Sequence, residues 1–230
     1  MNKYEIIILI GGRGKRVNKY TKKIPKCLIE FYGKPFLYYQ LKYLKKLGIK
    51  KVILSTGYLS KKIKDYVKEK INFINVKVIK DGKKSLGTGG AVIKSINLLK
   101  NNFYILYGDS FLNFDLRKLK KKNNKSIMAI YKNRNKYDSS NVDLRKSNLI
   151  YYNKKKTNIH YQYIDYGVSY FKKSVFKNEK KNENIDLASI LEKISKKNEL
   201  KGYLVKKRFY EIGSYNGIKQ FKKFIKNEIY

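Results

Sequence analysis

The sequence predicts a three-layer α/β/α fold, in which a mainly parallel, mixed sheet lies between two layers of helices. Short β-branched segments alternate with segments of helical periodicity through the first half of the chain, and this β-α-β order is typical of parallel strands covered by helices on both faces. The chain has 230 residues, a length that a single domain of this class commonly has. Hydrophobic residues make up 42% of the sequence and aromatic residues 14%, which suffices for a buried core despite the high charge.

The first half of the chain supplies the predicted parallel strands. The segment from Tyr4 to Ile10 is expected to form the first strand, because it is rich in β-branched residues and ends abruptly at two glycines. A helix is expected between Pro35 and Gly48, where apolar residues recur at helical spacing until the glycine. The same criteria predict, in order, a strand at 52–56, a helix at 60–70, a strand at 76–79, a helix at 88–99 and a strand at 103–107.

The second half, beyond Ser126, carries shorter predicted elements. They are, in order, a strand at 127–131, a hairpin turn at Ser147 and Asn148, a strand at 163–171, a helix at 187–194 and an extended segment at 203–211. Ser214 is expected to cap the N-terminus of a closing amphipathic helix. No internal repeat and no Pro-rich linker interrupts the chain, so we expect one domain over residues 1–230.

The formal net charge of +38 is the most extreme feature of the composition. Taken alone, it would favour a nucleic-acid binder or a protein that binds a membrane surface. The lysines are spread along the whole chain, however, and we find no basic helix face and no recognisable nucleic-acid-binding module. We therefore expect a solvated basic surface, with no specific nucleic acid and no membrane among the partners. No segment approaches the roughly 20 apolar residues that a membrane span needs.

A single cysteine, Cys27, limits the redox chemistry of the chain. One cysteine cannot form an internal disulfide or a cysteine-based zinc site, so nothing favours an oxidising compartment and we expect a cytoplasmic protein. The sequence does not determine the oligomeric state, and it is compatible with a homo-oligomer.

A basic, glycine-rich loop follows the first predicted strand. Its glycines allow the backbone to approach a ligand closely, and consecutive amide N–H groups in such a loop bind anions. Its arginines can hold phosphate oxygens in bidentate fashion, so a triphosphate is the expected ligand. The loop is neither a P-loop, which needs glycine at Leu9 and Ser or Thr at Arg16, nor a dinucleotide-binding loop, which needs glycine at Val17. It consists of Gly11, Gly12, Arg13, Gly14, Lys15 and Arg16.

Further motifs accompany this loop along the chain. The segment from Leu86 to Ala91 opens a predicted helix with three glycines, and so places backbone donors where an anion or a base edge can bind. The other motifs are Pro25-Lys26-Cys27-Leu28, Gly33-Lys34-Pro35, Gly108-Asp109-Ser110, Asn141-Val142, Asp165-Tyr166-Gly167 and Glu211-Ile212-Gly213-Ser214. With the Gly-Gly-x-Gly-x-Arg loop, this ordered series resembles the sugar-1-phosphate nucleotidyltransferase family over nearly the whole chain. Three positions depart from the family pattern, which more usually has Ser or Thr at Lys15, Trp at Tyr210 and Asp at Glu211.

The resemblance implies a Rossmann-like fold and an enzyme that joins a sugar 1-phosphate to a nucleoside triphosphate and releases pyrophosphate. It also implies two halves, with residues 1 to about 125 binding the nucleotide and residues from about 126 to 230 binding the sugar phosphate. A phosphate monoester has a second pKa near about 6, so the attacking oxygen is already largely ionised at neutral pH and needs no general base. Positioning and charge stabilisation are then the main tasks of the protein.

The resemblance also assigns roles to individual residues. Asp109 and Glu211 are expected to hold Mg²⁺, which typically takes one or two carboxylates together with phosphates and waters. Arg16, Lys26 and Asp109 are the implied catalytic residues, with Arg16 on the triphosphate and Lys26 on the sugar phosphate. The implied nucleotide-binding residues are Gly11, Gly12, Arg13, Gly14, Lys15, Gly87 and Thr88, and the implied sugar-binding residues are Asn141, Asp165 and Gly167.

The base and the sugar are less well determined by the motifs. The compact length and the Gly-Asp-Ser, Asp-Tyr-Gly and Phe-Tyr-Glu-Ile-Gly-Ser segments are most similar to short bacterial mannose- or heptose-1-phosphate guanylyltransferases, which implies GTP and a product for cell-surface glycan synthesis. Enzymes that use UTP or CTP share the same loop, and the residues expected to recognise the base, near Asp81 to Thr88, do not separate these alternatives. Two rival functions stay open, a non-catalytic domain that binds nucleotide or sugar phosphate and a basic nucleic-acid-binding protein.

Overall fold

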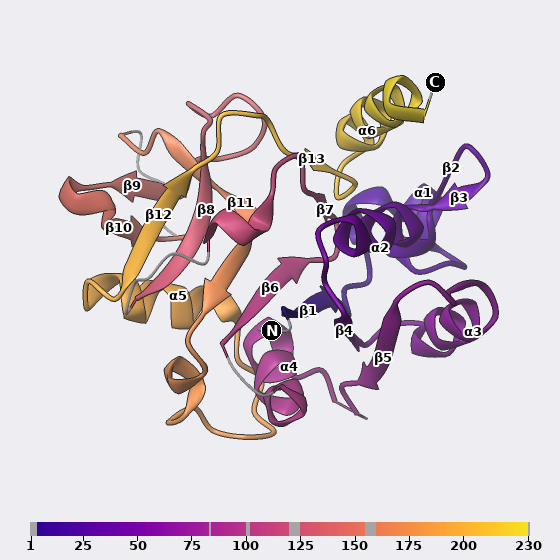
Figure 1. The fold of residues 1–230 in the computed structure, drawn as a ribbon, viewed down its shortest axis with the longest axis horizontal. Helices are drawn as coiled ribbons and strands as arrows, with labels where there is room; N and C mark the ends of the chain where they lie inside the picture. The colour runs from indigo at the N-terminus through magenta and orange to yellow at the C-terminus, as the bar shows by residue number, and fades with distance from the viewer. Residues whose placement is uncertain (1–3, 83, 100–101, 120–124, 155–159, 230) are drawn as a thin grey trace.

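The computed structural model shows a central twisted sheet with helices on both of its faces (Figure 1). It describes residues 4–82, 84–99, 102–119, 125–154 and 160–229. Within these residues the main sheet has nine strands, seven of them in the order β10-β9-β11-β6-β1-β4-β5, while β8 pairs with β11 and β12 beside this row. The predicted three-layer α/β/α arrangement is confirmed.

Four parallel strands form one half of the sheet. They are β5 (Asn75–Lys80), β4 (Lys51–Thr56), β1 (Glu5–Ile10) and β6 (Phe103–Tyr107). β1 lies between β4 and β6, and its residues Ile6, Ile7 and Ile8 are completely buried. Because helices cover both faces of β1, its sequence from Ile6 to Ile10 is a continuous apolar run. The carboxyl ends of the four strands meet at one edge of the sheet, where the glycine loop begins.

Antiparallel pairing dominates the other half of the sheet. Its strands are β8 (Ser126–Lys132), β9 (Val142–Leu144), β10 (Ile150–Tyr152), β11 (Tyr163–Phe171) and β12 (Leu200–Leu204). β11 pairs antiparallel with both β6 and β8, whereas β12 is parallel to β8. β9 and β10 form the predicted hairpin, and its turn residues Ser147 and Asn148 have positive φ angles of 57° and 58°. The sheet is therefore mixed, as predicted.

Two helices cover each face of the sheet within the described residues. The helices are α2 (Phe36–Lys46), α3 (Ser60–Lys70), α4 (Gly87–Ser95) and α5 (Leu187–Lys196). Ile6 and Ile8 of β1 belong to the core that contains α2 and α3, whereas Ile7 belongs to the core that contains α4 and α5. This alternation follows from the pleat of the strand, which points successive side chains to opposite faces.

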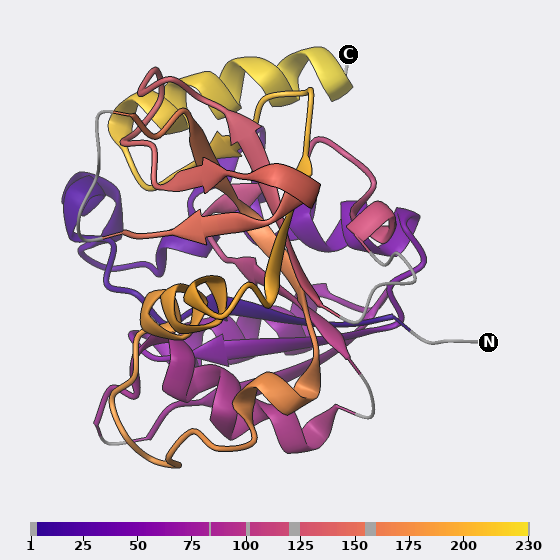
Figure 2. The ribbon, with the colours of Figure 1, turned by 90° about the vertical axis from the view of Figure 1, so that its left-hand side faces the viewer.

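The last helix, α6 (Tyr215–Ile229), lies along the top of the molecule in Figure 2 and packs against α2. An aromatic cluster holds it there: the ring centroid of Phe221 lies 4.8 Å from those of both Phe31 and Phe36. The Ser214 hydroxyl accepts a hydrogen bond from the backbone N–H of Gly217 at 2.9 Å, so the predicted cap of this helix is confirmed. The same hydroxyl donates to Oε1 of Glu211.

We expect Ser214→Ala to lower the free energy of unfolding by about 1 kcal/mol, because the Gly217 amide loses its acceptor at the helix N-terminus. Ser214→Thr keeps the hydroxyl and should retain most of that stability. Urea unfolding of both variants measures the difference. An equal loss in the two variants would show that the hydroxyl does not cap α6.

Two predicted segments differ from the structure. The extended segment at 203–211 was wrong as one element, because the exposed Lys206 and Lys207 break the alternation between buried and exposed residues. Its end instead forms β13 (Tyr210–Glu211), which pairs with β7 (Ser110–Phe111) in a separate two-stranded sheet. The helix predicted at 88–99 ends at Ser95 and continues as a 3-10 turn. Several short elements were not predicted, among them β7 and also α1 (Asn18–Thr21), β2 (Glu30–Phe31) and β3 (Lys34–Pro35).

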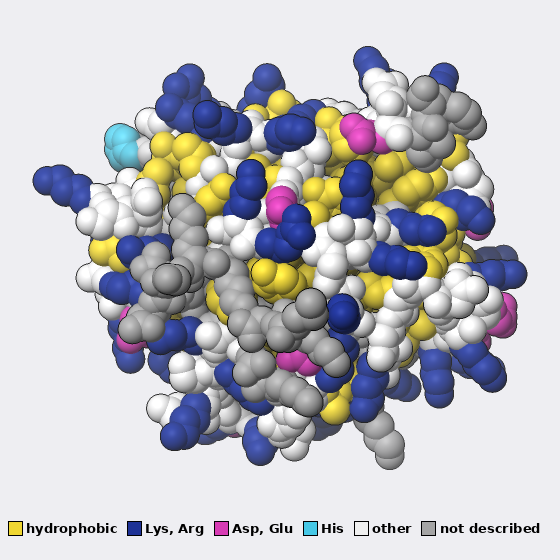
Figure 3. Space-filling view, viewed as in Figure 1, with side chains coloured by type: hydrophobic (Ala, Val, Ile, Leu, Met, Phe, Trp, Pro, Cys, Tyr) yellow, Lys and Arg dark blue, Asp and Glu magenta, His cyan; other side chains and the backbone are white. Residues whose placement is uncertain are grey.

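Basic side chains are distributed over the surface. Lysines and arginines are scattered across the face in Figure 3 and do not gather into one patch there. Among the described residues, the structure contains no helix that combines the length and the apolar character needed to cross a membrane.

Candidate active site

Two neighbouring cavities open at the carboxyl ends of the parallel strands. The first, which we call the glycine cavity, has a volume of about 270 Å³, and its lining includes Gly11, Gly12, Lys26, Gly87, Thr88 and Asp109. The second, which we call the carboxylate cavity, has a volume of about 350 Å³, and its lining includes Arg16, Asp109, Asn141, Asp165, Gly167 and Glu211. Tyr107 and Asp109 line both cavities, so a molecule in one would meet a molecule in the other at the end of β6.

A third hollow extends the glycine cavity along the glycine loop. Its lining includes Gly11 to Lys15, and it shares Gly11, Gly12, Asp81 and Ser85 with the glycine cavity. Gly14 begins the following turn with a φ of 65°, and its carbonyl accepts a hydrogen bond from Thr21 at 3.1 Å. The guanidinium of Arg13 lies 5.8 Å from the centre of the Tyr58 ring. The structure thus places all the predicted loop residues around a continuous hollow, except Arg16, which faces the carboxylate cavity.

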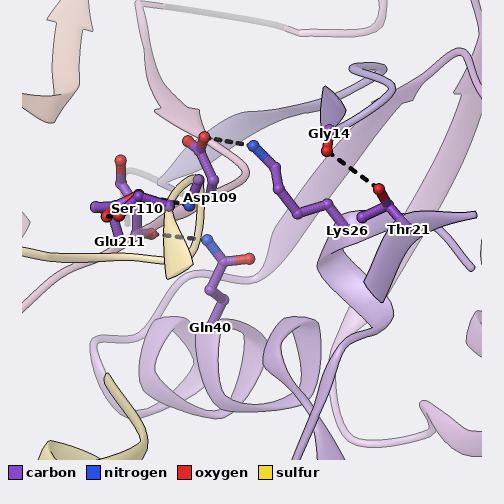
Figure 4. Close-up of polar contacts among 9 residues, drawn as sticks. Gly14, Thr21, Lys26, Gln40, Asp109, Ser110 and Glu211 are labelled. Carbon is purple, nitrogen blue, oxygen red and sulfur yellow. Dashed lines mark hydrogen bonds and ion pairs between the residues drawn. The ribbon is translucent and has the colours of Figure 1, made fainter. Parts of the chain in front are cut away.

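Asp109 is held at the junction of the two cavities. Its Oδ2 accepts a hydrogen bond from Nζ of Lys26 at 2.6 Å, and the two side chains are 27% and 19% exposed. In Figure 4, Lys26 reaches Asp109 from one side, and Glu211 lies on the other side. Beneath them, the buried Gln40 of α2 donates from Nε2 to the carbonyl of Ser110 at 2.8 Å, which fixes the backbone next to Asp109.

The two predicted metal ligands and Arg16 converge beside Gly213. A Cβ atom built on Gly213 would lie 2.9 Å from Oε2 of Glu211, 3.1 Å from Oδ2 of Asp109 and 3.2 Å from Nη2 of Arg16. These three side chains come from positions far apart in the sequence, and β13 brings Glu211 to Asp109 by pairing with β7. Glu211 is oriented by the Gly213 N–H and by the Ser214 hydroxyl, which bond to its two oxygens. The three predicted charges therefore surround one point.

The three predicted sugar-binding residues form one hydrogen-bonded chain. Oδ1 of Asn141 accepts from the backbone N–H of Asp165 at 3.0 Å, and Oδ1 of Asp165 accepts from the N–H of Gly167 at 2.8 Å. The pairing register of β8 and β11 shifts between Asp165 and Ser169, so these residues lie at a β-bulge. Bulges of this kind aim a side chain away from the regular pleat, here into the carboxylate cavity.

Two glycines allow the strands around Asp109 to approach closely. Gly167 has a φ of 97°, and a Cβ on it would lie 2.4 Å from Oγ of Ser110. A Cβ on Gly108 would lie 2.0 Å from Cγ2 of Ile10. Any side chain at either position would therefore push the Gly108-Asp109-Ser110 segment out of place.

Burial raises the pKa of the Asp165 carboxyl to about 6, and the hydrogen bond from Gly167 and the charge of Lys154 oppose this rise. Because the folded-state pKa lies above the ordinary value of 3.8, the folded protein binds this proton more tightly than the unfolded chain does. The contribution of Asp165 to stability therefore falls as the pH rises from about 4 to about 6, and stays low above that range. A charged, half-buried carboxylate at neutral pH is a cost to folding that a polar ligand would offset.

We expect Asp165→Asn to raise the melting temperature at pH 7.5 by about 2 to 4 °C, the shift that roughly 1 kcal/mol produces in a chain of this length. The amide oxygen still accepts from Gly167, but no charge is buried. Near pH 4 the difference should vanish, because the wild-type carboxyl is then protonated. Asp143→Asn, at a carboxylate that is 43% exposed on the neighbouring β9, is the matched control. The same stabilisation at both pH values, or in the control, would contradict this account.

The glycines in the first turn of α4 have a different local role from the predicted one. The amides of Gly89 and Gly90 both donate to the carbonyl of Ile185, at 2.7 and 3.2 Å, so they are not free to bind an anion. A Cβ on Gly87 would lie 2.5 Å from that same carbonyl. The Thr88 hydroxyl donates to Asp186, which caps α5. Gly87 and Thr88, the residues expected to bind nucleotide, line the glycine cavity, and the other glycines serve the contact with residues 183–186.

Several cavity residues were missed by sequence reasoning. Ser55 lines the glycine cavity, and Tyr107, Tyr152 and Phe209 are among those that line the carboxylate cavity. Asp81 and Ser85 also line the glycine cavity, but they belong to the segment near Asp81 to Thr88 in which the base-recognising residues are expected. Ser55 and Tyr107 lie near the carboxyl ends of β4 and β6, the positions where parallel sheets usually bind ligands. That rule could have identified them from the predicted strands. Tyr152 and Phe209 carry no such signal in the sequence.

The sequence matches a known protein family over almost its whole length. The profile of the family described as nucleotidyl transferase matches residues 5–228. The chain belongs to the nucleotidyl transferase family. The transferase is 33% identical over 210 residues to D-glycero-alpha-D-manno-heptose 1-phosphate guanylyltransferase of Campylobacter jejuni subsp. jejuni serotype O:2, in a match that covers 91% of this chain and 94% of the relative. A protein of the same name from Aneurinibacillus thermoaerophilus is 40% identical over 116 residues, which cover 50% of each chain.

Solved structures share the fold of the transferase. HddC from Yersinia pseudotuberculosis, complexed with GMP-PN, superposes with a TM-score of 0.78 at 21% identity, over 96% of this chain and 99% of that chain. The inositol-1-phosphate CTP transferase from T. maritima superposes with a TM-score of 0.81 at 22% identity, over 97% and 96% of the two chains. At these identities the likeness concerns the fold alone, and it confirms the predicted Rossmann-like architecture.

Proposed function

We propose that this transferase moves GMP from GTP onto a mannose- or heptose-type sugar 1-phosphate and releases pyrophosphate. The observation that carries the proposal is the shared wall of the two cavities: Asp109 lines both, beside Lys26 on one side and Arg16 and Glu211 on the other. Two phosphorylated substrates in neighbouring cavities would meet at this group of charges. The guanylyltransferase relatives support GTP as the donor and heptose 1-phosphate or mannose 1-phosphate as the acceptor.

We assign the nucleotide to the glycine cavity and its triphosphate to the hollow along the glycine loop, where Arg13 and Lys15 add positive charge. The sugar occupies the carboxylate cavity, where Asp165 accepts hydrogen bonds from its hydroxyl groups. Residues from both halves of the chain line this second cavity, including Arg16 from the first and Asn141 from the second. We therefore assign most nucleotide contacts to the residues before about 125 and most sugar contacts to those after it. Arg16 is an exception, because it belongs to the first half but faces the sugar cavity.

In the proposed reaction an oxygen of the sugar phosphate attacks the α-phosphorus of GTP, a P–O bond forms, and the bond to the leaving pyrophosphate breaks. The nucleophile is already ionised at neutral pH, so the obstacle is the approach of two anions. Lys26, which contacts Asp109 directly, and Arg16, which lies near the same carboxylate, stabilise the negative charge that accumulates in the transition state.

The donor set beside Gly213 fits Mg²⁺. The described residues hold no cluster of three or more His, Cys, Asp or Glu side chains that would form a metal centre of protein ligands alone. Mg²⁺ does not need one, since it commonly takes one or two carboxylates together with substrate phosphates and waters. Asp109 and Glu211, whose oxygens lie within 3.1 Å of one point, would hold it. When bound, the ion neutralises phosphate charge and orients the phosphates.

The test is pyrophosphate release with Mg²⁺, measured for GTP, UTP, CTP and ATP in combination with mannose, heptose and glucose 1-phosphates. GTP with the mannose or heptose form is expected to be the fastest pair. Faster release with UTP or CTP would overturn the assignment of the donor. If no pair releases pyrophosphate while GTP still raises the melting temperature, the chain is a non-catalytic nucleotide-binding domain and the proposal fails.

A further inference from the structure

Two buried polar groups in the glycine cavity have no hydrogen-bond partner within the part of the chain that the structure describes. They are Oγ of Ser55, in a residue only 2% exposed, and Oδ1 of Asp81. Both residues line the glycine cavity. A buried polar atom without a partner costs free energy, so native proteins rarely retain one unless something else binds to it. Their common position on the wall of a cavity indicates a ligand that supplies the missing partners.

The backbone holds Asp81 in place although Oδ1 of its side chain has no partner among the described residues. Its N–H donates to the carbonyl of Thr56 at 2.9 Å, which continues the pairing of β4 with β5 by one residue. The ammonium of Lys94 donates to the carbonyls of Lys80 and Asp81, at 2.7 and 2.5 Å. Lys94 is thus engaged with the main chain around Asp81, and Gly11 leaves the carboxylate open toward the loop, since a Cβ there would lie 3.6 Å from Oδ2.

Burial raises the pKa of the Asp81 carboxyl, an effect that Lys94 and a hydrogen bond from the Leu86 backbone only partly offset. Ser55 is equally fixed, because it lies inside β4 with Leu9 and Ile79 as its neighbours on the two flanking strands. A rigid carboxylate and a rigid hydroxyl at the carboxyl ends of adjacent strands form a preorganised polar site.

We propose that Asp81 and Ser55 recognise the guanine base: the Asp81 carboxylate accepts from N1–H and the 2-amino group, and the Ser55 hydroxyl donates to O6. This inference rests on the proposed function, because it concerns the base of the GTP that the transferase would use. Guanine presents one acceptor followed by two adjacent donors along its Watson–Crick edge, and a hydroxyl beside a carboxylate supplies the complement.

The other common bases do not match this pair of groups. Uracil offers a single donor between two carbonyl oxygens, and cytosine and adenine place an acceptor nitrogen next to their amino group. That nitrogen or carbonyl would face the Asp81 carboxylate and leave it repelled or unpaired. A site that is built to hydrogen-bond a substrate discriminates strongly against analogues that leave its buried polar groups without partners.

Inosine triphosphate separates the contribution of Asp81 from that of the rest of the nucleotide. It keeps O6 and N1–H but lacks the 2-amino group, so the carboxylate retains only one of its two donors. For the wild-type transferase, kcat/KM for GTP is expected to exceed that for ITP roughly 10- to 100-fold, the range typical of a bidentate base contact. In Asp81→Asn the ratio should fall to near unity. Ser55→Ala should lower both values alike, because both nucleotides carry O6.

The control is Asp65→Asn, which alters an exposed carboxylate on α3 and should leave the GTP-to-ITP ratio unchanged. The rise in melting temperature on adding GTP or ITP reports binding independently of turnover, and also verifies that each variant is folded. If wild-type protein turns over GTP and ITP equally, or if Asp81→Asn keeps the wild-type ratio, the inference about Asp81 is wrong while the proposed function stands. If the wild type prefers UTP or CTP, the proposed donor has failed and the inference falls with it.

Discussion

Asp109→Asn is expected to lower kcat by about 10²- to 10³-fold, the loss that follows the removal of one fixed electrostatic contact to a transition state. Asp109 is the only one of the predicted charged residues that lines both described cavities and contacts Lys26, so its loss affects both substrates. Asparagine has nearly the same shape, and Lys26 would then lack the anion that holds it. The measurement is steady-state pyrophosphate release at saturating GTP and sugar 1-phosphate.

Asp115→Asn serves as the control for that measurement. Asp115 forms an ion pair with Arg117 at 2.7 Å, and Arg117 is 45% exposed, so the substitution should cost little. A variant at Asp109 that keeps more than a tenth of the wild-type rate would contradict the central position that the structure gives to this carboxylate.

Gly213→Ala is expected to lower kcat/KM by about 10²-fold although it adds one methyl group, because misplacement of reacting groups by about 1 Å has an effect of this size. The new Cβ would lie 2.9 to 3.2 Å from charged atoms of Glu211, Asp109 and Arg16, and would occupy the point around which they gather. The φ angle of Gly213 is not positive, so alanine can adopt its backbone conformation. The fold should therefore survive and the activity should not.

Circular dichroism and thermal unfolding would separate the two effects of this substitution. Asn216→Ala, at an exposed position in the first turn of α6, is the matched control for disturbance of the helix start. Near wild-type activity in Gly213→Ala would mean that the space beside Gly213 is not used in the reaction.

The fold could be predicted from the sequence where local pattern and long-range packing agree. The strand at Glu5–Ile10 is a largely apolar, β-branched run that ends at two glycines, and the helix at Phe36–Lys46 has apolar residues at helical spacing before a glycine. The segment at 203–211 failed because the exposed Lys206 and Lys207 interrupt it and because its two ends pair with different strands, β8 and β7.

The candidate site could be predicted in part for the same reason. Each motif identifies a candidate residue but not its neighbours in space. The structure brings Asp109 and Glu211 together by pairing β7 with β13, two strands that are separated by about half of the chain. Contacts of that length also explain what was missed. The glycines in the first turn of α4 accommodate the backbone of Ile185, almost a hundred residues away. That Ser55 and Asp81 each carry a buried atom without a hydrogen-bond partner among the described residues becomes visible only in the folded structure.

The central claim is that an oxygen of the sugar 1-phosphate attacks the α-phosphorus of GTP. The most direct test uses a sugar 1-phosphate whose phosphate oxygens carry ¹⁸O, unlabelled GTP and mass spectrometry of both products. We predict that the GDP-sugar retains all of the label, with one labelled oxygen bridging the two phosphorus atoms, and that the pyrophosphate carries none. Loss of one labelled oxygen from the GDP-sugar would place the attack on the sugar phosphate instead and contradict the account.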